Sequence, residues 1–271
     1  HPDSLVPGHI NQLCARAVAH GIDIFKVLQA ACVNPVLHYA LDAGLLRTGD
    51  PADFILVNDL QSFTVSKTFI NGQLVAEDGR SLITTRPAGV INNFSCTEKT
   101  ITDFEVDWNG EEEIPVIEAL DGQLITNRLS CRPKVSNGKM ISDTENDVLK
   151  MVVVNRYQEA PVAKAFIKNF GLKRGAIAST VAHDSHNIVA VGVTDDDICG
   201  AVNLVIRHQG GVAYHLSGTN ERGWEMKGAE VLPLPVAGLM STEDGYQVAE
   251  RYSAIDREVK ETLGSTLAAP F

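Results

Sequence analysis

The sequence predicts a multidomain protein with α/β and α+β parts, and three observations support this prediction. Its 271 residues are 44% hydrophobic and only 21% charged, so the chain can bury more than one apolar core. Residues 10–43 place apolar side chains three and four positions apart, which is typical of helices. Residues 52–75 have β-type composition, and strand patterns mix with helical ones after residue 113.

The helical stretch is expected to hold two or three short helices, interrupted at Gly21 and at Asn34-Pro35. Asn71-Gly72 predicts a two-residue hairpin turn in the β-unit that follows. Residues 78–112 are polar and form a connection. Beyond it we expect strands at 114–118, 123–129 and 148–154, a helix at 162–169, a strand on each side of 183–187, a helix at 195–208, a strand at 211–216 and an amphipathic helix at about 243–263.

Charge and cysteine content exclude several classes of protein. The chain has 23 basic and 34 acidic residues, a net charge of −11, and no basic run that could neutralise a polynucleotide, so no nucleic-acid polymer is expected as a partner. Its apolar runs fall short of the roughly 20 residues that span a bilayer, so no membrane segment is expected. Five cysteines without a CxxC pair argue against a disulfide framework or structural zinc site and favour the cytoplasm. The chain opens at His1 without an initiator Met, so we expect upstream sequence to be missing.

Two stretches resemble a known enzyme family. Residues 33–75 resemble the junction found across amidohydrolases, where the last helices of a (β/α)8 barrel lead through a G-x-x-A-D-F turn into a small β-sandwich. Residues 168–203, which contain the motif HDSHN at 183–187, closely resemble the C-terminal domain of bacterial adenine deaminases, and so does PLPVAGLMS at 233–241. One departure is the segment NRYQEA at 155–160, where relatives usually carry a His- and Gly-rich turn.

The resemblance implies three domains. Residues 1–48 would be the helical tail of a truncated barrel, residues 49–112 the small β-sandwich part with its connection, and residues 113–271 an α+β domain with a mixed sheet. Residues 1–13 resemble the segment that follows the eighth barrel strand, directly after a metal-binding aspartate.

The resemblance also implies a reaction, the hydrolytic deamination of adenine to hypoxanthine and ammonia. The family uses a divalent metal, iron or manganese with zinc as a further candidate, whose bound water attacks the purine. In this family the metal ligands include an HxH pair, which this chain lacks. We therefore expect no metal site here and no activity from these 271 residues alone. Expected partners are adenine, the missing N-terminal barrel portion and a second copy in a homodimer.

The candidate site residues gather in the HDSHN motif. A two-residue hairpin loop at Asp184-Ser185 would place His183 and His186 opposite each other on one face, with donors and acceptors suited to a purine edge. Histidine near neutral pH can also move protons. From the resemblance we assign catalytic roles to His183, Asp184 and His186, and substrate binding to Ser185, Asn187 and His1.

Alternatives remain open at this point. The motif alone also fits a polar turn whose side chains satisfy nearby backbone groups, and HxxH without a third ligand makes an incomplete metal site. For the whole chain, the alternatives are a non-catalytic nucleobase-binding or assembly module, and an amidohydrolase that acts on another cyclic amidine or amide. Elsewhere, we interpret residues 194–197 as a helix N-cap and Gly210-Gly211 as a left-handed helix end.

Overall fold

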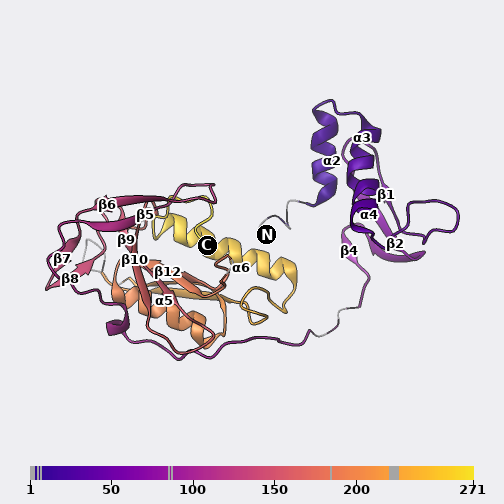
Figure 1. Cartoon of the computed structure of the whole chain (residues 1–271). Helices are drawn as coiled ribbons and strands as arrows, with labels where there is room; N and C mark the ends of the chain where they lie inside the picture. Colours follow the sequence, from indigo (N-terminus) through magenta and orange to yellow (C-terminus); the bar gives the residue numbers. More distant parts are fainter. Residues whose placement is uncertain are drawn as a thin grey trace. The chain divides into compact units, whose positions relative to one another are not determined.

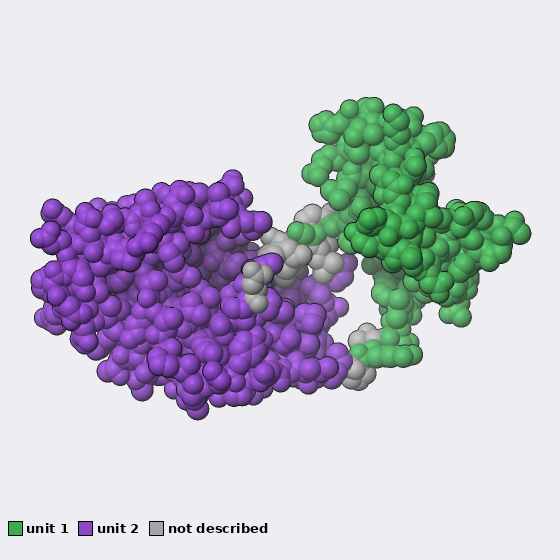
Figure 2. All heavy atoms as spheres, in the orientation of Figure 1, with its two compact units in different colours: residues 1, 3–87 green, residues 2, 88–271 purple. Residues whose placement is uncertain are grey.

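The structure, a computed structural model, describes residues 4, 6, 8–84, 86, 88–183, 185–219 and 226–271. The chain divides into two compact units, shown in different colours in Figure 2, and the division falls at about residue 87. The expected domain boundaries at residues 48 and 112 stay predictions. No helix in the described part of the chain is long and apolar enough to cross a membrane.

The first unit combines short helices with a small antiparallel sheet. Its strands pair in chain order, from the first to the last of the four. The elements are α2 (Ile10–Ala19), α3 (Ile24–Leu28), the π-helical η1 (Gln29–Val33), α4 (Asn34–Tyr39), β1 (Phe54–Val57), β2 (Val65–Ile70), β3 (Gln73–Glu77) and β4 (Arg80–Ser81). The expected hairpin turn between β2 and β3 is confirmed, because Asn71 and Gly72 have φ angles of 49° and 74°.

The expected interruption at Asn34-Pro35 is wrong, because helical structure runs on from α3 through η1 into α4. The N–H of Asn34 donates to the carbonyl of Gln29, five residues back, so the turn before the proline is π-helical. Pro35 then lies in the first turn of α4, directly after this π-helical turn.

The second unit is α+β and contains an eight-stranded mixed sheet in the order β14-β13-β11-β12-β9-β10-β5-β6. Neighbouring strands run antiparallel except β10 and β5, which run parallel. The bounds are β5 (Ile114–Glu118), β6 (Asn127–Cys131), β9 (Val148–Val154), β10 (Ala163–Lys168), β11 (Ala176–Ser179), β12 (Ile188–Gly192), β13 (Gly211–Leu216) and β14 (Gly228–Pro233). A separate hairpin contains β7 (Lys134–Ser136) and β8 (Lys139–Ile141), and the helices are η2 (Ile101–Phe104), α5 (Asp195–Arg207) and α6 (Gly245–Glu261).

The two long helices cover opposite faces of this sheet (Figure 1). Along β11, Ala176 and Ala178 pack in the core that contains α5, whereas Ile177 packs in the core that contains Ile255 of α6. Side chains of a strand alternate between faces, so a strand buried on both sides is apolar at every position. This is why residues 176–178 are apolar at every position, and the polar Ser179 follows at the end of the strand.

The predicted helix at 162–169 is wrong. These residues form β10, which pairs with β9 over six residues. Phe166 is buried in one core cluster and its neighbour Ile167 in another, so the segment lacks the simple alternation of a half-exposed strand. Sequence reasoning also missed the β7–β8 hairpin, although Asn137-Gly138 at its turn, with φ angles of 50° and 73°, carries the same signal as Asn71-Gly72.

The strand expected at 123–129 lies at 127–131 as β6, and β14 was not expected, whereas the long helices α5 and α6 lie close to their expected positions. Helix α5 begins after Thr194, whose Oγ1 accepts a hydrogen bond from the N–H of Asp197 at 3.1 Å, as the N-cap interpretation requires. At the other end of α5, Gln209 rather than the glycine pair adopts the left-handed conformation, with φ 55°. Its N–H bonds to Ile206 and that of Gly210 to Val205, which is the Schellman pattern.

Candidate functional site

The HDSHN motif lies in a surface loop of the second unit, residues 180–187, which we call the histidine loop. The last residue pair of the β11–β12 ladder is Ser179 with Val189, so the loop is longer than the expected two-residue turn. The prediction that His183 and His186 form an opposed pair is therefore wrong. The chain leaves the ladder at Thr180, whose N–H donates instead to the carbonyl of Gly211 on β13 at 3.0 Å.

Two backbone hydrogen bonds join described residues within the loop. The N–H of Ser185 donates to the carbonyl of His183, and that of His186 to the carbonyl of Ala182, both at 2.9 Å. His183 and Ser185 are exposed, whereas His186 and Asn187 are half-buried. Two of the predicted site residues, Asp184 and His1, lie outside the described residues.

His186 has two unusual properties. Its φ is 48°, a left-handed conformation that residues other than glycine rarely adopt and that costs on the order of 1–3 kcal/mol. Its ring atom Nδ1 is buried and has no hydrogen-bond partner in the described structure. A buried polar atom without a partner is uncommon in folded proteins and often marks a functional position.

Arg156 fixes the loop to the rest of the unit, although sequence reasoning did not single it out. Only 3% of this residue is exposed. Its Nε donates to the carbonyl of His186 at 2.6 Å, and its backbone N–H donates to Oδ1 of Asn187 at 3.3 Å. The hydroxyl of Tyr157 donates to the carbonyl of Ser185 at 3.0 Å. We refer to the hydrogen bonds of Arg156 and Tyr157 as the Arg156 network.

The same network reaches two other segments. Nη1 of Arg156 donates to Oδ1 of Asn92 at 2.8 Å and to the carbonyl of Asn93 at 3.3 Å. Nη2 donates to the Tyr157 hydroxyl at 3.1 Å and to the carbonyl of Ala237 at 2.7 Å. The histidine loop is thereby joined to the segment before η2 and to the turn that follows β14.

The turn after β14 approaches the loop so closely that a side chain at its tip would crowd its neighbours. Gly238 has a φ of 72°, and a Cβ there would lie 3.2 Å from Cζ of Arg156 and 3.3 Å from Cβ of Thr180. Its carbonyl accepts a hydrogen bond from Thr180 Oγ1 at 2.6 Å. The residues 233–241, which resembled the family in sequence, therefore contact the histidine loop in space.

Glu159 belongs to the segment 155–160, in which the sequence departs from the family pattern. Its carboxylate pairs with Lys99 at 2.5 Å and accepts a hydrogen bond from the backbone of Thr97. The hydrogen bond from Lys99 is the main cause that lowers the pKa of Glu159 to about 2. Residues 155–160 thus hold both the histidine loop and the segment that leads into η2.

An apolar cavity of about 140 Å³ borders the histidine loop at Ala182. No charged side chain lines this cavity, and Ser179 of β11 is the polar residue in its wall. Its other walls are side chains of the α6 face of the sheet and the C-terminal residues, namely Met151, Ile167, Phe170, Ile177, Val189, Val191, Pro270 and Phe271.

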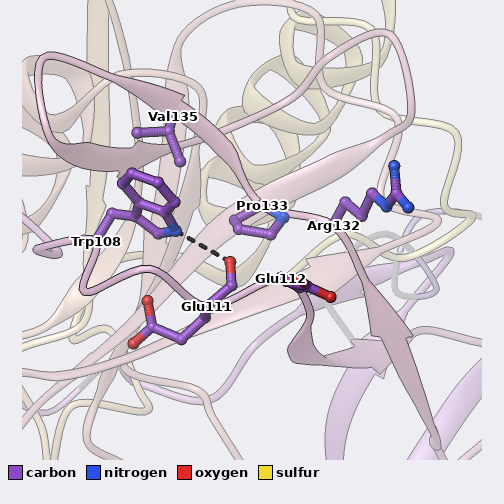
Figure 3. Close-up of a pocket in the computed structure, with 6 residues that line it drawn as sticks. All are labelled: Trp108, Glu111, Glu112, Arg132, Pro133 and Val135. Atoms are coloured by element: carbon purple, nitrogen blue, oxygen red, sulfur yellow. Dashed lines mark hydrogen bonds between the residues drawn. The ribbon is translucent and has the colours of Figure 1, made fainter.

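A second pocket of about 360 Å³ opens beside the β7–β8 hairpin and shares no residue with the histidine loop (Figure 3). Trp108 forms one wall, and its indole N–H donates to the carbonyl of Glu111 at 3.0 Å. Glu112 and Arg132 bring charges of opposite sign to its rim. None of the residues predicted from the HDSHN motif lines this pocket.

A further polar cluster, at the start of α5, was interpreted from sequence only as a helix cap. The buried carboxylate of Asp197 accepts hydrogen bonds from His215 Nδ1 at 3.1 Å, from Ser217 at 2.8 Å and from Thr194 Oγ1 at 2.7 Å. Burial alone would raise its pKa, but these hydrogen bonds hold the pKa below the ordinary value. The spacing of Thr194 and Asp197 predicts only the helix cap, and no spacing predicts the contacts to His215 and Ser217, which lie on β13 and directly after it.

The described residues were expected to lack a metal site, and their donor groups bear on that expectation. Across the described ranges, no group of three His, Cys, Asp or Glu side chains could hold a metal ion. All five cysteines are free. The described residues therefore do not fit a divalent metal centre.

Comparison with known proteins identifies relatives of both units. Residues 123–271 match the family model described as adenine deaminase C-terminal domain, and residues 4–75 match the amidohydrolase family model. The whole chain aligns with proteins named adenine deaminase from Methanosarcina barkeri at 48% identity, Salinibacter ruber at 47% and Borreliella burgdorferi at 43%. It covers 49%, 48% and 48% of these relatives, so the chain spans about half their length.

Proposed function

Because this chain belongs to the family of the adenine deaminase C-terminal domain, we propose that it is part of a hydrolase that converts adenine to hypoxanthine and ammonia. The observation that carries this proposal is the alignment of the entire chain with relatives named adenine deaminase, at up to 48% identity. Such an enzyme would serve adenine catabolism and purine salvage.

We propose that the helices of the first unit complete a (β/α)8 barrel and that its sheet is part of a small β-sandwich. The match of residues 4–75 to the amidohydrolase family supports this. So does the surface of the unit, where Phe25, Leu37 and Tyr39 are 76%, 65% and 70% exposed. Large apolar side chains at such exposure are typical of a surface that another part of the protein covers.

The divalent metal of the family, iron, manganese or zinc, is assigned in this proposal to the part of the enzyme that lies outside this chain. The described residues do not supply a ligand set for it. The 271-residue chain alone is accordingly proposed to be inactive.

We assign the histidine loop to the active site as the part that orders adenine and moves protons. His183, Asp184 and His186 are the proposed catalytic residues, and Ser185, Asn187 and His1 are the proposed substrate-binding residues. The exposed His183 and Ser185 and the unpartnered Nδ1 of His186 support this assignment, because imidazole and hydroxyl groups can both donate to and accept from a purine edge. We also propose that the enzyme is a cytoplasmic homodimer.

Measurement of hypoxanthine formation by the full-length gene product, loaded with iron(II) or manganese(II), tests the function. The 271-residue chain is assayed in parallel under the same conditions. Turnover by the long protein alone is the expected result. Absence of turnover by both would disprove adenine as substrate and favour another cyclic amidine, whereas turnover by the 271 residues would disprove the placement of the metal.

A further inference from the structure

The side chain of Arg156 uses every hydrogen-bond donor that it has. An arginine carries five N–H groups in one rigid plane. Here they meet five acceptors, which are the carbonyls of His186, Asn93 and Ala237, Oδ1 of Asn92 and the hydroxyl of Tyr157. A buried guanidinium that is satisfied in this way can move only if several charge-assisted hydrogen bonds break together.

The Arg156 network holds three consecutive residues of the histidine loop, one bond to each. Tyr157 Oη bonds to the carbonyl of Ser185, Arg156 Nε to the carbonyl of His186, and the N–H of Arg156 to the side chain of Asn187. The guanidinium also lies over the Tyr157 ring, 4.5 Å from its centre, which fixes the orientation of both residues.

The held backbone sets the point from which the imidazole of His186 projects. His186 keeps a left-handed φ of 48°, which requires support from its surroundings, and the 2.6 Å bond from Arg156 is made to the carbonyl of this same residue. The backbone that carries the ring is thereby held, while the buried Nδ1 has no partner in the described structure. A ring on a held backbone with an unused nitrogen can bond to a ligand or an ordered water.

We propose that Arg156 is the positioning residue of the histidine loop and that it acts on adenine turnover through His186. This inference rests on the proposed function. Arg156 touches no substrate in this role, because its donors are all engaged within the protein. Tyr157 assists by donating a hydrogen bond to the carbonyl of Ser185. The segment 155–160, in which the sequence departs from the family pattern, therefore contributes a contact to the loop.

The first test compares single variants of the full-length enzyme. Arg156→Lys keeps the charge but cannot reach five acceptors in one plane, and kcat should fall about 30- to 100-fold while KM for adenine changes less than about threefold, because small misplacements at a reacting centre are costly. Tyr157→Phe removes one hydroxyl and should lower kcat about 3- to 10-fold. The matched control is Arg251→Lys, since Arg251 bonds to the carbonyl of Val231 and to Glu243 away from the loop. The kcat of this variant should stay within about twofold of the wild-type value.

The second test is a double-mutant cycle with His186→Ala. If Arg156 acts through His186, Arg156→Lys should cost less than about threefold in kcat once His186 is absent. A general structural role would predict that the two losses multiply, and that result would overturn the proposal. Tyr157→Phe in the same cycle gives the answer if Arg156→Lys folds poorly.

Amide hydrogen exchange of residues 181–188 separates failure of this inference from failure of the proposed function. An inactive wild-type enzyme would disprove the function, yet faster loop exchange in Arg156→Lys than in Arg251→Lys would still show that Arg156 holds the loop. An active wild type with unchanged exchange and unchanged kcat in Arg156→Lys would refute the positioning role while leaving the function intact.

Discussion

Replacement of Gly238, in the turn after β14, by alanine should lower the free energy of unfolding by disturbing the residues that hold the histidine loop. Gly238 has a φ of 72°, and the added Cβ would lie 3.2 Å from both Cζ and Nη1 of Arg156 and 3.3 Å from Cβ of Thr180. Both neighbours are buried. Contacts this close force the neighbours to shift by a few tenths of an ångström, and Arg156 can shift only by stretching its hydrogen bonds.

The expected loss of stability has two parts. A left-handed backbone costs an alanine about 1 kcal/mol relative to glycine. Stretching hydrogen bonds of a buried guanidinium adds about 1–2 kcal/mol, since bonds to a charged group contribute about 1.5–3 kcal/mol each when well formed. The free energy of unfolding should therefore fall by about 2–3 kcal/mol, the sum of these parts.

Gly122→Ala is the matched control, because Gly122 has a φ of 68° and no atom within 4 Å of the added Cβ. It should lose only the backbone part, about 1 kcal/mol. Urea unfolding of the 271-residue chain, followed by tryptophan fluorescence, measures both variants, because Trp108 belongs to the second unit. Equal losses in Gly238→Ala and Gly122→Ala would refute the idea that this turn presses on the Arg156 network.

Three further predictions concern charged groups of the second unit. Because the hydrogen bond from Lys99 lowers the pKa of Glu159 from 4.5 to about 2, the stability that Glu159 contributes is present above pH 4.5 and is lost as the pH falls towards 2. The free energy of unfolding should therefore be higher for wild type than for Glu159→Gln at neutral pH, and this difference should disappear near pH 2. A difference in free energy that stays constant with pH would contradict this. Lys150 is 2% exposed and bonds to Asp195 at 2.5 Å. Lys150→Ala and Lys150→Met both remove this ion pair, but only Met keeps the volume of the buried side chain, so Lys150→Ala should cost about 3 kcal/mol in urea unfolding and Lys150→Met clearly less. Equal costs would mean that loss of the ion pair, and not loss of packing, sets the destabilisation. Asp197→Asn should cost about 2 kcal/mol at neutral pH because it weakens a buried set of hydrogen bonds, and a neutral result in the same assay would show that the amide replaces the carboxylate.

Local signals in the sequence predicted much of the second unit. Helix α5 was predicted from its Thr194 N-cap and its amphipathic pattern. Strands β9 and β13 have the bounds that their apolar runs predicted. The resemblance to the adenine deaminase C-terminal domain is confirmed by the match of residues 123–271. These features depend on neighbours in the chain, which a sequence displays directly.

Tertiary context decided the features that were missed. Residues 163–168 became β10 because Phe166 and Ile167 are buried on opposite sides of the sheet, an environment that periodicity alone does not distinguish from a buried helix. The histidine loop was expected to be a tight hairpin from its flanking strands, but Thr180 bonds to Gly211 on β13 rather than continuing the ladder with β12. Long-range hydrogen bonds of this kind leave no local trace.

The histidine loop therefore owes its geometry to residues outside the motif. Within the described part of the loop, backbone bonds fix only the turn from Ala182 to His186. The Arg156 network, about thirty positions earlier in the chain, supplies the bonds to residues 185–187. Two proteins with the same HDSHN letters can consequently present different imidazole positions if they differ at residues 155–160. The chemistry of the motif has to be judged together with that segment, since a hydrogen bond from Arg156 holds His186 in its left-handed conformation.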